Sequence, residues 1–255
     1  MAGIFQLSRE ARDGNAVMNK SVPVIQATNL SRFFGPHKAV TKINLEILPG
    51  SAFGLMGENG AGKTTLLRLI AGLILPSSGK LEVLGLDPSK QQPDLGHKIG
   101  FVPEEPALFP EMGVRSQLLF FGGAKGLSGQ NLRDSVDHQL ERFDLLSYTK
   151  RPCGSLSRGL RKRVALALGF LDDPELMLLD EPTSGLDPVH RDSFISWLLQ
   201  KRGETSWILS SHDLEEIQSL TSHTAYLEEG SLKGIDISTD LAHLKPKQNQ
   251  LWKHP

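Results

Sequence analysis

The segment Gly57–Thr64 constrains this chain more than any other feature, because it has the pattern G-x-x-x-x-G-K-T. It directly follows the apolar run Ala52–Met56 and precedes a helix-like stretch, Thr65–Ile70. Between a strand and a helix, such glycines let backbone N–H groups surround phosphates, and the helix N-terminus attracts anions. Lys63 would neutralise the β and γ phosphates, and the Thr64 hydroxyl could bind Mg²⁺. The sequence therefore predicts a phosphate-binding loop.

A second apolar run, Leu176–Leu179, ends in two carboxylates, Asp180 and Glu181. As a strand, this run would deliver Asp180 beside the phosphate loop, where a carboxylate can hold Mg²⁺ through water. Glu181 could then orient or deprotonate an attacking water. Taken alone, an apolar run followed by Asp-Glu is equally well explained as a solvated strand end. Its pairing with the phosphate loop favours the chemical role.

Two kinds of strand are predicted. Alternation of apolar and polar residues indicates half-buried antiparallel strands; it begins at Val24 and recurs at Ile43–Ile47 and Leu81–Leu84. Strands buried on both faces of a parallel sheet are apolar throughout, and four runs have this character: Ala52–Met56, Ile99–Val102, Leu176–Leu179 and Trp207–Leu209. We therefore predict an α/β fold, a P-loop NTPase core with a mainly parallel sheet and an antiparallel β subdomain.

The stretch between Pro106 and Ser155 has no strong strand pattern and is predicted to be an inserted helical subdomain. Helical periodicity with three- and four-residue steps runs from Leu132 to Phe143 and returns from Leu160 to Leu171. Near the C-terminus, Glu229-Gly230 separates two short apolar stretches and predicts a hairpin that returns the chain to the antiparallel strands.

Composition narrows the possible functions. Lys plus Arg number 28 and Asp plus Glu 29, so a formal charge of −1 provides no overall field for binding nucleic acid. No apolar run approaches the roughly 18 to 20 residues that span a bilayer. The single cysteine, Cys153, cannot close an intrachain disulfide and is interpreted as a spectator. A local basic cluster is interpreted as a solvated helix face, and no nucleic-acid partner is expected; it comprises Lys150, Arg151, Arg158, Arg161, Lys162 and Arg163.

From about residue 23 to 235 the chain resembles the nucleotide-binding subunits of ATP-binding-cassette (ABC) transporters. The segment Leu156-Ser157-Arg158-Gly159-Leu160 precedes Asp180 and is similar to the family signature L-S-G-G-Q. Ser184-Gly185-Leu186-Asp187 is similar to the D-loop of the family, and His212 in Ser-Ser-His-Asp is similar to its switch histidine. Phe34-Gly35 stands where the family usually places an aromatic that stacks on adenine.

The resemblance implies an ATPase with ATP and Mg²⁺ as cofactors, which couples hydrolysis to a membrane permease on another polypeptide. It also implies a second ATP-binding subunit, identical or homologous, because the family sandwiches ATP between two chains. The subunit would lie at the cytoplasmic face of the cell membrane, bound through the permease. The style of the motifs favours an exporter. The alternatives are a soluble non-transport ABC-type ATPase and a regulatory subunit that binds ATP with little turnover.

The resemblance also implies a set of site residues. The catalytic residues would be Lys63, Glu181 and His212. The metal ligands would be Thr64, Glu104 and Asp180. The nucleotide-binding residues would be Phe34, Gly57, Asn59, Gly60, Gly62, Lys63, Thr64, Thr65, Glu104, Ser157, Gly159 and Asp187. For adenine stacking, Phe33 in place of Phe34, or a core position for Phe34, remain alternatives.

The signature departs from the family pattern at two positions. Arg158 replaces the first glycine and Leu160 replaces the glutamine, whereas Ser157 and Gly159 are kept. Ser157 is a good N-cap by its own chemistry, so the free N–H groups of the following helix can still form an anion site. Glu104 is a third departure, because the family usually has glutamine after that strand; a carboxylate can also bind Mg²⁺.

These motifs set the predicted boundaries. A flexible N-terminal tail is expected at 1–22, an ABC-type ATP-binding domain at 23–238 and a C-terminal tail at 239–255. The helical subdomain is placed at about 106–160.

Overall fold

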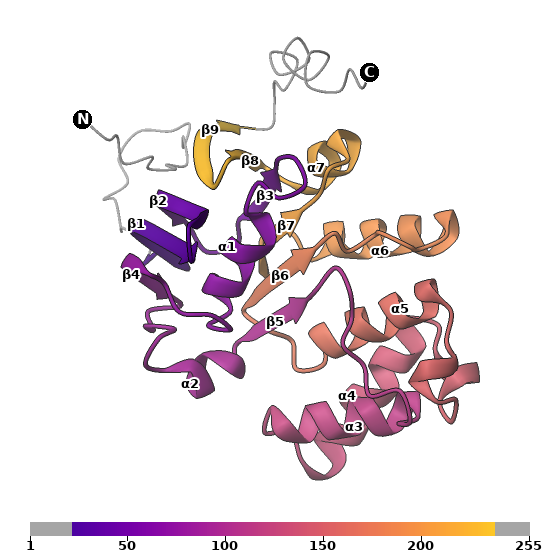
Figure 1. The fold of residues 1–255 in the computed structure, drawn as a ribbon. Coiled ribbons are helices and arrows are strands. Elements are labelled where there is room, and N and C mark those ends of the chain that lie inside the picture. The colour runs from indigo at the N-terminus through magenta and orange to yellow at the C-terminus, as the bar shows by residue number, and fades with distance from the viewer. Residues whose placement is uncertain (1–21, 238–255) are drawn as a thin grey trace, which may run out of the picture.

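The computed structural model describes residues 22–237, which form a six-stranded sheet, a three-stranded sheet and surrounding helices. The three-stranded sheet and the helices α3 and α4 lie on opposite flanks of the molecule, with the six-stranded sheet between them (Figure 1). The tails predicted at 1–22 and 239–255 fall, except for Val22, outside the described residues.

The larger sheet has the strand order β5-β6-β7-β3-β8-β9, in which β9 alone runs antiparallel to its neighbour. Strands β3, β6 and β7 are buried along their whole length, which confirms that their apolar runs are strands covered on both faces. The bounds are β3 Ala52–Met56, β5 Ile99–Val102, β6 Leu176–Asp180, β7 Ser206–Ser210, β8 His223–Glu228 and β9 Ser231–Ile237.

The core lies on both faces of this sheet, because successive strand side chains point to opposite sides. Leu178 and Ile208 join the core that contains helix α1 and the smaller sheet. Leu179 and Trp207 join the core that contains the helical insertion and α7. The helices outside the insertion are α1 Lys63–Ile70, α2 Gln92–Gly96, α6 Pro188–Gln200 and α7 Leu214–Leu220.

The smaller sheet is antiparallel with the order β2-β1-β4, as its alternating pattern predicted. Its strands are β1 Ile25–Phe34, β2 His37–Ile47 and β4 Ser78–Val83. The predicted hairpin exists as β8 and β9 around Glu229-Gly230, but its assignment to the antiparallel strands is wrong. Because β8 pairs with β3, the hairpin extends the six-stranded sheet. It also lies against β2, where Thr41 N–H donates to the Gly230 carbonyl at 2.7 Å.

The helical insertion contains α3 Val114–Ala124, α4 Gly129–Arg142 and two single 3-10 turns, η1 Leu146–Tyr148 and η2 Cys153–Ser155. Helix α5, Arg158–Gly169, then leads the chain back to the sheet. Val136 and Leu140 of α4 are fully buried in the same core as Val164 of α5, as the periodicity predicted. Among residues 22–237, no helix is long and apolar enough to cross a membrane.

The basic cluster around α5 is only partly a solvated face. Four of its members are exposed, namely Lys150, Arg151, Arg158 and Arg161. The interpretation is wrong for Lys162 and Arg163, which keep only 1% and 8% of their surface exposed. Both are buried because backbone carbonyls accept hydrogen bonds from them, an arrangement that hydrophobic periodicity does not report.

Candidate functional site

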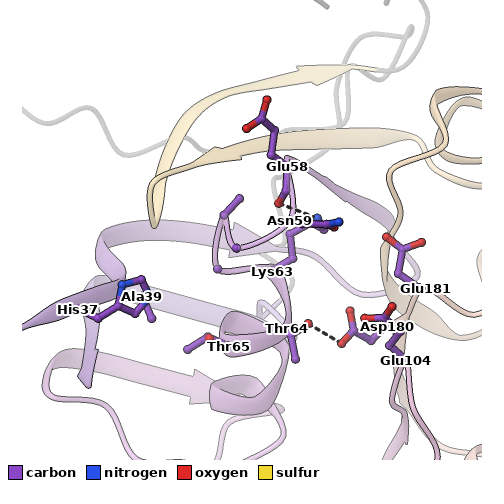
Figure 2. Close-up of a pocket in the computed structure, with 13 residues that line it drawn as sticks. His37, Ala39, Glu58, Asn59, Lys63, Thr64, Thr65, Glu104, Asp180 and Glu181 are labelled. Atoms are coloured by element: carbon purple, nitrogen blue, oxygen red, sulfur yellow. Dashed lines mark hydrogen bonds between the residues drawn. The ribbon is translucent and has the colours of Figure 1, made fainter. Parts of the chain in front are cut away.

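The phosphate loop joins β3 to α1 and lines a cavity of about 390 Å³ (Figure 2). Two of its glycines are required by close backbone approach as well as by a positive φ. A Cβ on Gly57, at φ 154°, would lie 2.3 Å from the Leu227 carbonyl oxygen, and one on Gly62, at φ 104°, would lie 2.2 Å from that of Ala39. Any side chain here would displace the loop from the neighbouring strands.

Lys63 begins α1 and bends over the loop. Its Nζ donates to the carbonyl oxygens of Gly57 at 2.7 Å and Glu58 at 3.2 Å. Burial lowers the pKa of Lys63, while the carboxylates of Glu181, Asp180 and Glu104 act in the opposite direction. An anion in the cavity would meet this buried cation and the start of a helix.

Three carboxylates, those of Glu104, Asp180 and Glu181, lie together on one side of the loop, and His37 lies on the other (Figure 2). Asp180, the last residue of β6, accepts hydrogen bonds from Thr64 Oγ1 at 2.7 Å and from Ser210 Oγ at 2.5 Å. The possible metal ligands that meet here are therefore hydroxyl and carboxylate oxygens, which are suitable ligands for Mg²⁺.

Within residues 22–237, no group of three or more His, Cys, Asp or Glu residues is arranged to hold a metal ion by itself. Mg²⁺ is usually held by one or two protein carboxylates together with waters and the phosphates of the substrate.

Glu181 follows Asp180 with a left-handed backbone, φ 46°, which is uncommon for a residue with a Cβ. Its N–H donates to the Ser210 carbonyl oxygen at 3.1 Å and to Ser210 Oγ at 3.2 Å, which holds this conformation. Burial raises the pKa of Glu181, and a hydrogen bond with His212 opposes that rise. His212 Nδ1 lies 3.0 Å from Glu181 Oε2, with 61% of the histidine side chain exposed. Glu181 is therefore a buried carboxyl group in contact with a solvent-facing imidazole.

The residues of the predicted signature do not join this group. Ser157 is exposed and caps α5, its Oγ accepting from Leu160 N–H at 3.3 Å. Arg158 donates to Ser184 Oγ at 3.2 Å, and a Cβ on Gly159 would approach the Gly185 carbonyl oxygen to 2.8 Å. The signature therefore packs against the D-loop of its own chain and does not line the cavity that holds Lys63.

Asp187 also lies outside the cavity lining. It is the N-cap of α6, where its Oδ1 accepts from His190 N–H at 3.1 Å and its Oδ2 lies 2.7 Å from His190 Nδ1. Within one chain its contacts are structural.

Phe34 lies at the turn between β1 and β2 with 45% of its surface exposed, and Phe33 has 37% exposed. The alternative that Phe34 is a core residue is therefore wrong. The guanidinium carbon of Arg32 stands 4.5 Å from the centroid of the Phe34 ring. Neither phenylalanine lines the cavity, so adenine stacking remains a prediction.

Several residues at the site have no role in the sequence motifs. His37 and Ala39 of β2 line the cavity, and no local pattern marks them because sheet pairing brings them there. Ser210 holds both Asp180 and Glu181. It is the first residue of the Ser-Ser-His-Asp segment, but that motif points to His212 and not to the Ser210 hydroxyl. Lys162 donates to three carbonyl oxygens at the edge of the site, including that of Asp180.

The fold and the phosphate loop together define a P-loop NTPase. A family model described as ABC transporter matches residues 40–184. Among curated proteins, the chain is 36% identical over 82% of its length to the bacitracin transport ATP-binding protein BcrA of Bacillus licheniformis, covering 68% of that protein. It is 36% identical, again over 82%, to the ABC transporter ATP-binding protein NatA of Bacillus subtilis, covering 87% of it. It is also 36% identical over 81% to the Nod factor export ATP-binding protein I of Cupriavidus metallidurans, covering 69%.

Solved structures agree on the fold. The chain matches cbiO1 of Clostridium perfringens, described as part of the ABC transporter complex cbiONQ, with a TM-score of 0.74 and 26% identity over 91% of this chain and 95% of that one. A bacterial ABC transporter cassette solved as a dimer, MJ0796, matches with a TM-score of 0.78 and 24% identity over 85% and 100%. The chain belongs to the ABC transporter family. Within that family it is an ATP-binding subunit, and it is an ATPase.

Proposed function

We propose that this subunit hydrolyses Mg²⁺-bound ATP at the cavity beside Lys63 and uses nucleotide-driven dimer closure to power a membrane permease. The observation that carries this proposal is that Lys63 and Thr64 of α1 converge there with Asp180, the last residue of β6, and with Glu181, which follows it. Lys63 neutralises the phosphates. Thr64, Asp180 and Glu104 would hold Mg²⁺, which when bound would supply further charge neutralisation at the phosphates. Glu181, whose pKa burial raises, accepts a proton from the attacking water, and His212 orients its carboxylate.

The site is completed by a second chain. Ser157 and Gly159 are exposed or half-exposed at the N-terminus of α5, a helix end that favours an anion, yet they lie outside the cavity of their own chain. In a dimer, this N-terminus of α5 would face the γ-phosphate that is bound by the other chain, whether that chain is identical or homologous. A fold shared with a cassette solved as a dimer supports this arrangement.

The permease docks in an apolar groove of about 550 Å³ between β5 and the helical insertion. Phe101, Leu108, Phe121 and Leu168 line it. Two further lining residues, Pro103 and Pro106, stand on either side of Glu104-Glu105, and Glu104 lines the ATP cavity, so the docked partner can sense the nucleotide state. The subunit is thereby held at the cytoplasmic face of the membrane. Export is the favoured direction, because one relative is named for Nod factor export and another for linearmycin resistance.

Co-purification from membranes with a tagged full-length chain tests this function. We expect a transmembrane protein to co-purify, Phe121→Ser to release it, and the matched control Leu146→Ser, at an exposed apolar residue outside the groove, to retain it. In cells, loss of the chain should raise sensitivity to a toxic compound, and wild type but not Glu181→Gln should restore resistance. Lost nutrient uptake would instead refute export, and ATP turnover without any membrane partner would refute transport.

A further inference from the structure

Lys162 is a buried cation outside the set of residues that contact the cavity. It lies in the first turns of α5 with 1% of its surface exposed. Its Nζ donates to the carbonyl oxygens of Pro103 at 3.1 Å, Glu104 at 3.1 Å and Asp180 at 3.3 Å. An ammonium group has three protons to donate, and each is matched by one acceptor.

These carbonyl oxygens belong to the ends of two adjacent strands. Pro103 and Glu104 follow β5 and lead into the helical insertion, while Asp180 ends β6. The two strands are paired up to Val102 and Leu179, after which no ladder hydrogen bond holds them together. Lys162 spans this opening, directly behind the point where Glu104 and Asp180 face the cavity.

Keeping a charge at this position is costly, because burial disfavours an ammonium group. Burial lowers the pKa of Lys162 to about 8, while the carboxylates of Asp180, Glu104 and Glu181 oppose that change and Arg158 reinforces it. A long apolar side chain would fill the same volume without this cost. The three hydrogen bonds are what an apolar side chain could not supply.

The next residue ties the other side of the helix. Arg163 Nη1 donates to the carbonyl oxygens of Phe143 at 3.1 Å and Asp144 at 3.0 Å, at the end of the helical insertion. Consecutive residues of a helix point about 100° apart. Helix α5, which begins at the signature, is therefore anchored to the strand ends through Lys162 and to the insertion through Arg163.

We propose that Lys162 is a positioning residue for ATP hydrolysis, which fixes the Glu104 segment relative to Asp180-Glu181 and ties both to the signature helix. It acts through backbone carbonyls and does not touch the reacting atoms. This inference rests on the hydrolytic site proposed above. As a consequence, α5, the helix that begins at the signature, determines how far the Glu104 carboxylate lies from those of Asp180 and Glu181.

The test uses the full chain and four variants. Lys162→Met removes the donors and keeps the length of the side chain, and Lys162→Gln retains two donors on a shorter one. Lys125→Met is the control, because Lys125 Nζ also donates to a carbonyl of β5, that of Ile99 at 2.9 Å, but at the far end of the strand. Lys125 also pairs with Asp172 at 2.8 Å, so this control loses an ion pair as well as a carbonyl contact, and thermal unfolding accounts for that difference. Glu181→Gln reports on the hydrolytic site. The measurements are ATP affinity with a fluorescent nucleotide, kcat and KM for ATP, thermal unfolding and amide hydrogen exchange.

Lys162→Met should lower kcat at least about tenfold, since small misplacements of catalytic groups carry penalties of that size. ATP affinity should change by less than about threefold, because the phosphate loop is untouched. Exchange should accelerate at 103–110 and 181–186 and not across the whole chain. Lys162→Gln should have an intermediate kcat, and Lys125→Met should remain near wild type.

A kcat within about twofold of wild type for Lys162→Met would overturn the proposal, as would an equal loss of kcat in Lys125→Met. If Lys162→Met does not fold, Lys162→Gln decides: reduced kcat with unchanged ATP affinity supports the role, and wild-type kcat overturns it. Normal turnover by Glu181→Gln would refute the hydrolytic site itself. If that variant is inactive while Lys162→Met turns over normally, the positioning role alone fails.

Discussion

The phosphate-loop region and the signature region are built in opposite ways. Around the phosphate loop, Lys63, Thr64 and Glu181 find hydrogen-bond partners in their own chain and are wholly or largely buried. At the signature, Ser157 is exposed and makes one capping bond of 3.3 Å. The phosphate-loop region is assembled by the folding of one chain. The signature region, by contrast, exposes Ser157 at the N-terminus of α5 on the molecular surface.

The difference also appears in backbone strain. In the phosphate-loop region Glu181 has φ 46°, and a non-glycine residue in that conformation costs of order 1–3 kcal/mol, whereas the glycines of the loop adopt positive φ without strain. Ser157 has ordinary extended angles, φ −62° and ψ 163°. The fold thus spends stability to preorganise the first region and little on the second. Substitutions in the phosphate-loop region should alter ATP binding or hydrolysis within one chain. Substitutions in the signature region should alter only the steps that require two chains.

The largest effect is expected at Glu181. Glu181→Gln keeps the volume and removes the basic oxygen, so hydrolysis should slow by at least about a hundredfold while ATP binding persists. The measurement is phosphate release under saturating ATP beside nucleotide affinity. Turnover near the wild-type rate would show that the preorganised region lacks its base.

Lys63 should govern binding more than chemistry. Lys63→Ala removes a fixed cation among the phosphates, and charge-assisted hydrogen bonds of about 1.5–3 kcal/mol correspond to roughly a tenfold to hundredfold loss of ATP affinity. Titration with a fluorescent ATP analogue measures it. An unchanged affinity would mean that the loop glycines and helix N–H groups bind the phosphates without help from the lysine.

Ser157 tests the outward-facing region directly. Ser157→Arg adds bulk where a partner would close, so turnover should fall at least about tenfold while ATP affinity stays near wild type. Mixing it with Lys63→Ala chains should restore some activity, because certain dimers then contain one site with an intact phosphate loop and an intact signature. Undiminished turnover by Ser157→Arg with the permease present would end the two-chain mechanism.

The same contrast explains how far the sequence could be interpreted. The phosphate loop and the Asp180-Glu181 strand end were predictable because short motifs on buried strands determine local geometry directly. The β8–β9 hairpin was predicted, but its sheet was not, because the pairing of β8 with β3 is a long-range choice that local alternation does not encode. Lys162 was misassigned because its partners are carbonyl groups of other segments, which have no signature in sequence. Buried cations satisfied by backbone oxygens are a class that hydrophobic periodicity places on the wrong face.

The smallest effect on ATP binding is expected from Phe33 and Phe34, because neither side chain lines the cavity. Arg32 covers one face of Phe34 at 4.5 Å, which leaves the opposite face of an exposed ring for a base. Stacking of a base on an aromatic side chain contributes about 1 kcal/mol at the low end, so Phe34→Ala should weaken ATP binding about fivefold. Phe33→Ala should change it by less than about twofold, and the two variants control for each other because both rings are exposed on the same strand. Comparing ATP with inorganic triphosphate separates base from phosphate contacts, since only ATP binding should respond to Phe34→Ala. Equal losses for both phenylalanines would assign the effect to the β1–β2 turn as a whole, and no loss for either would place adenine elsewhere, against β2 at His37.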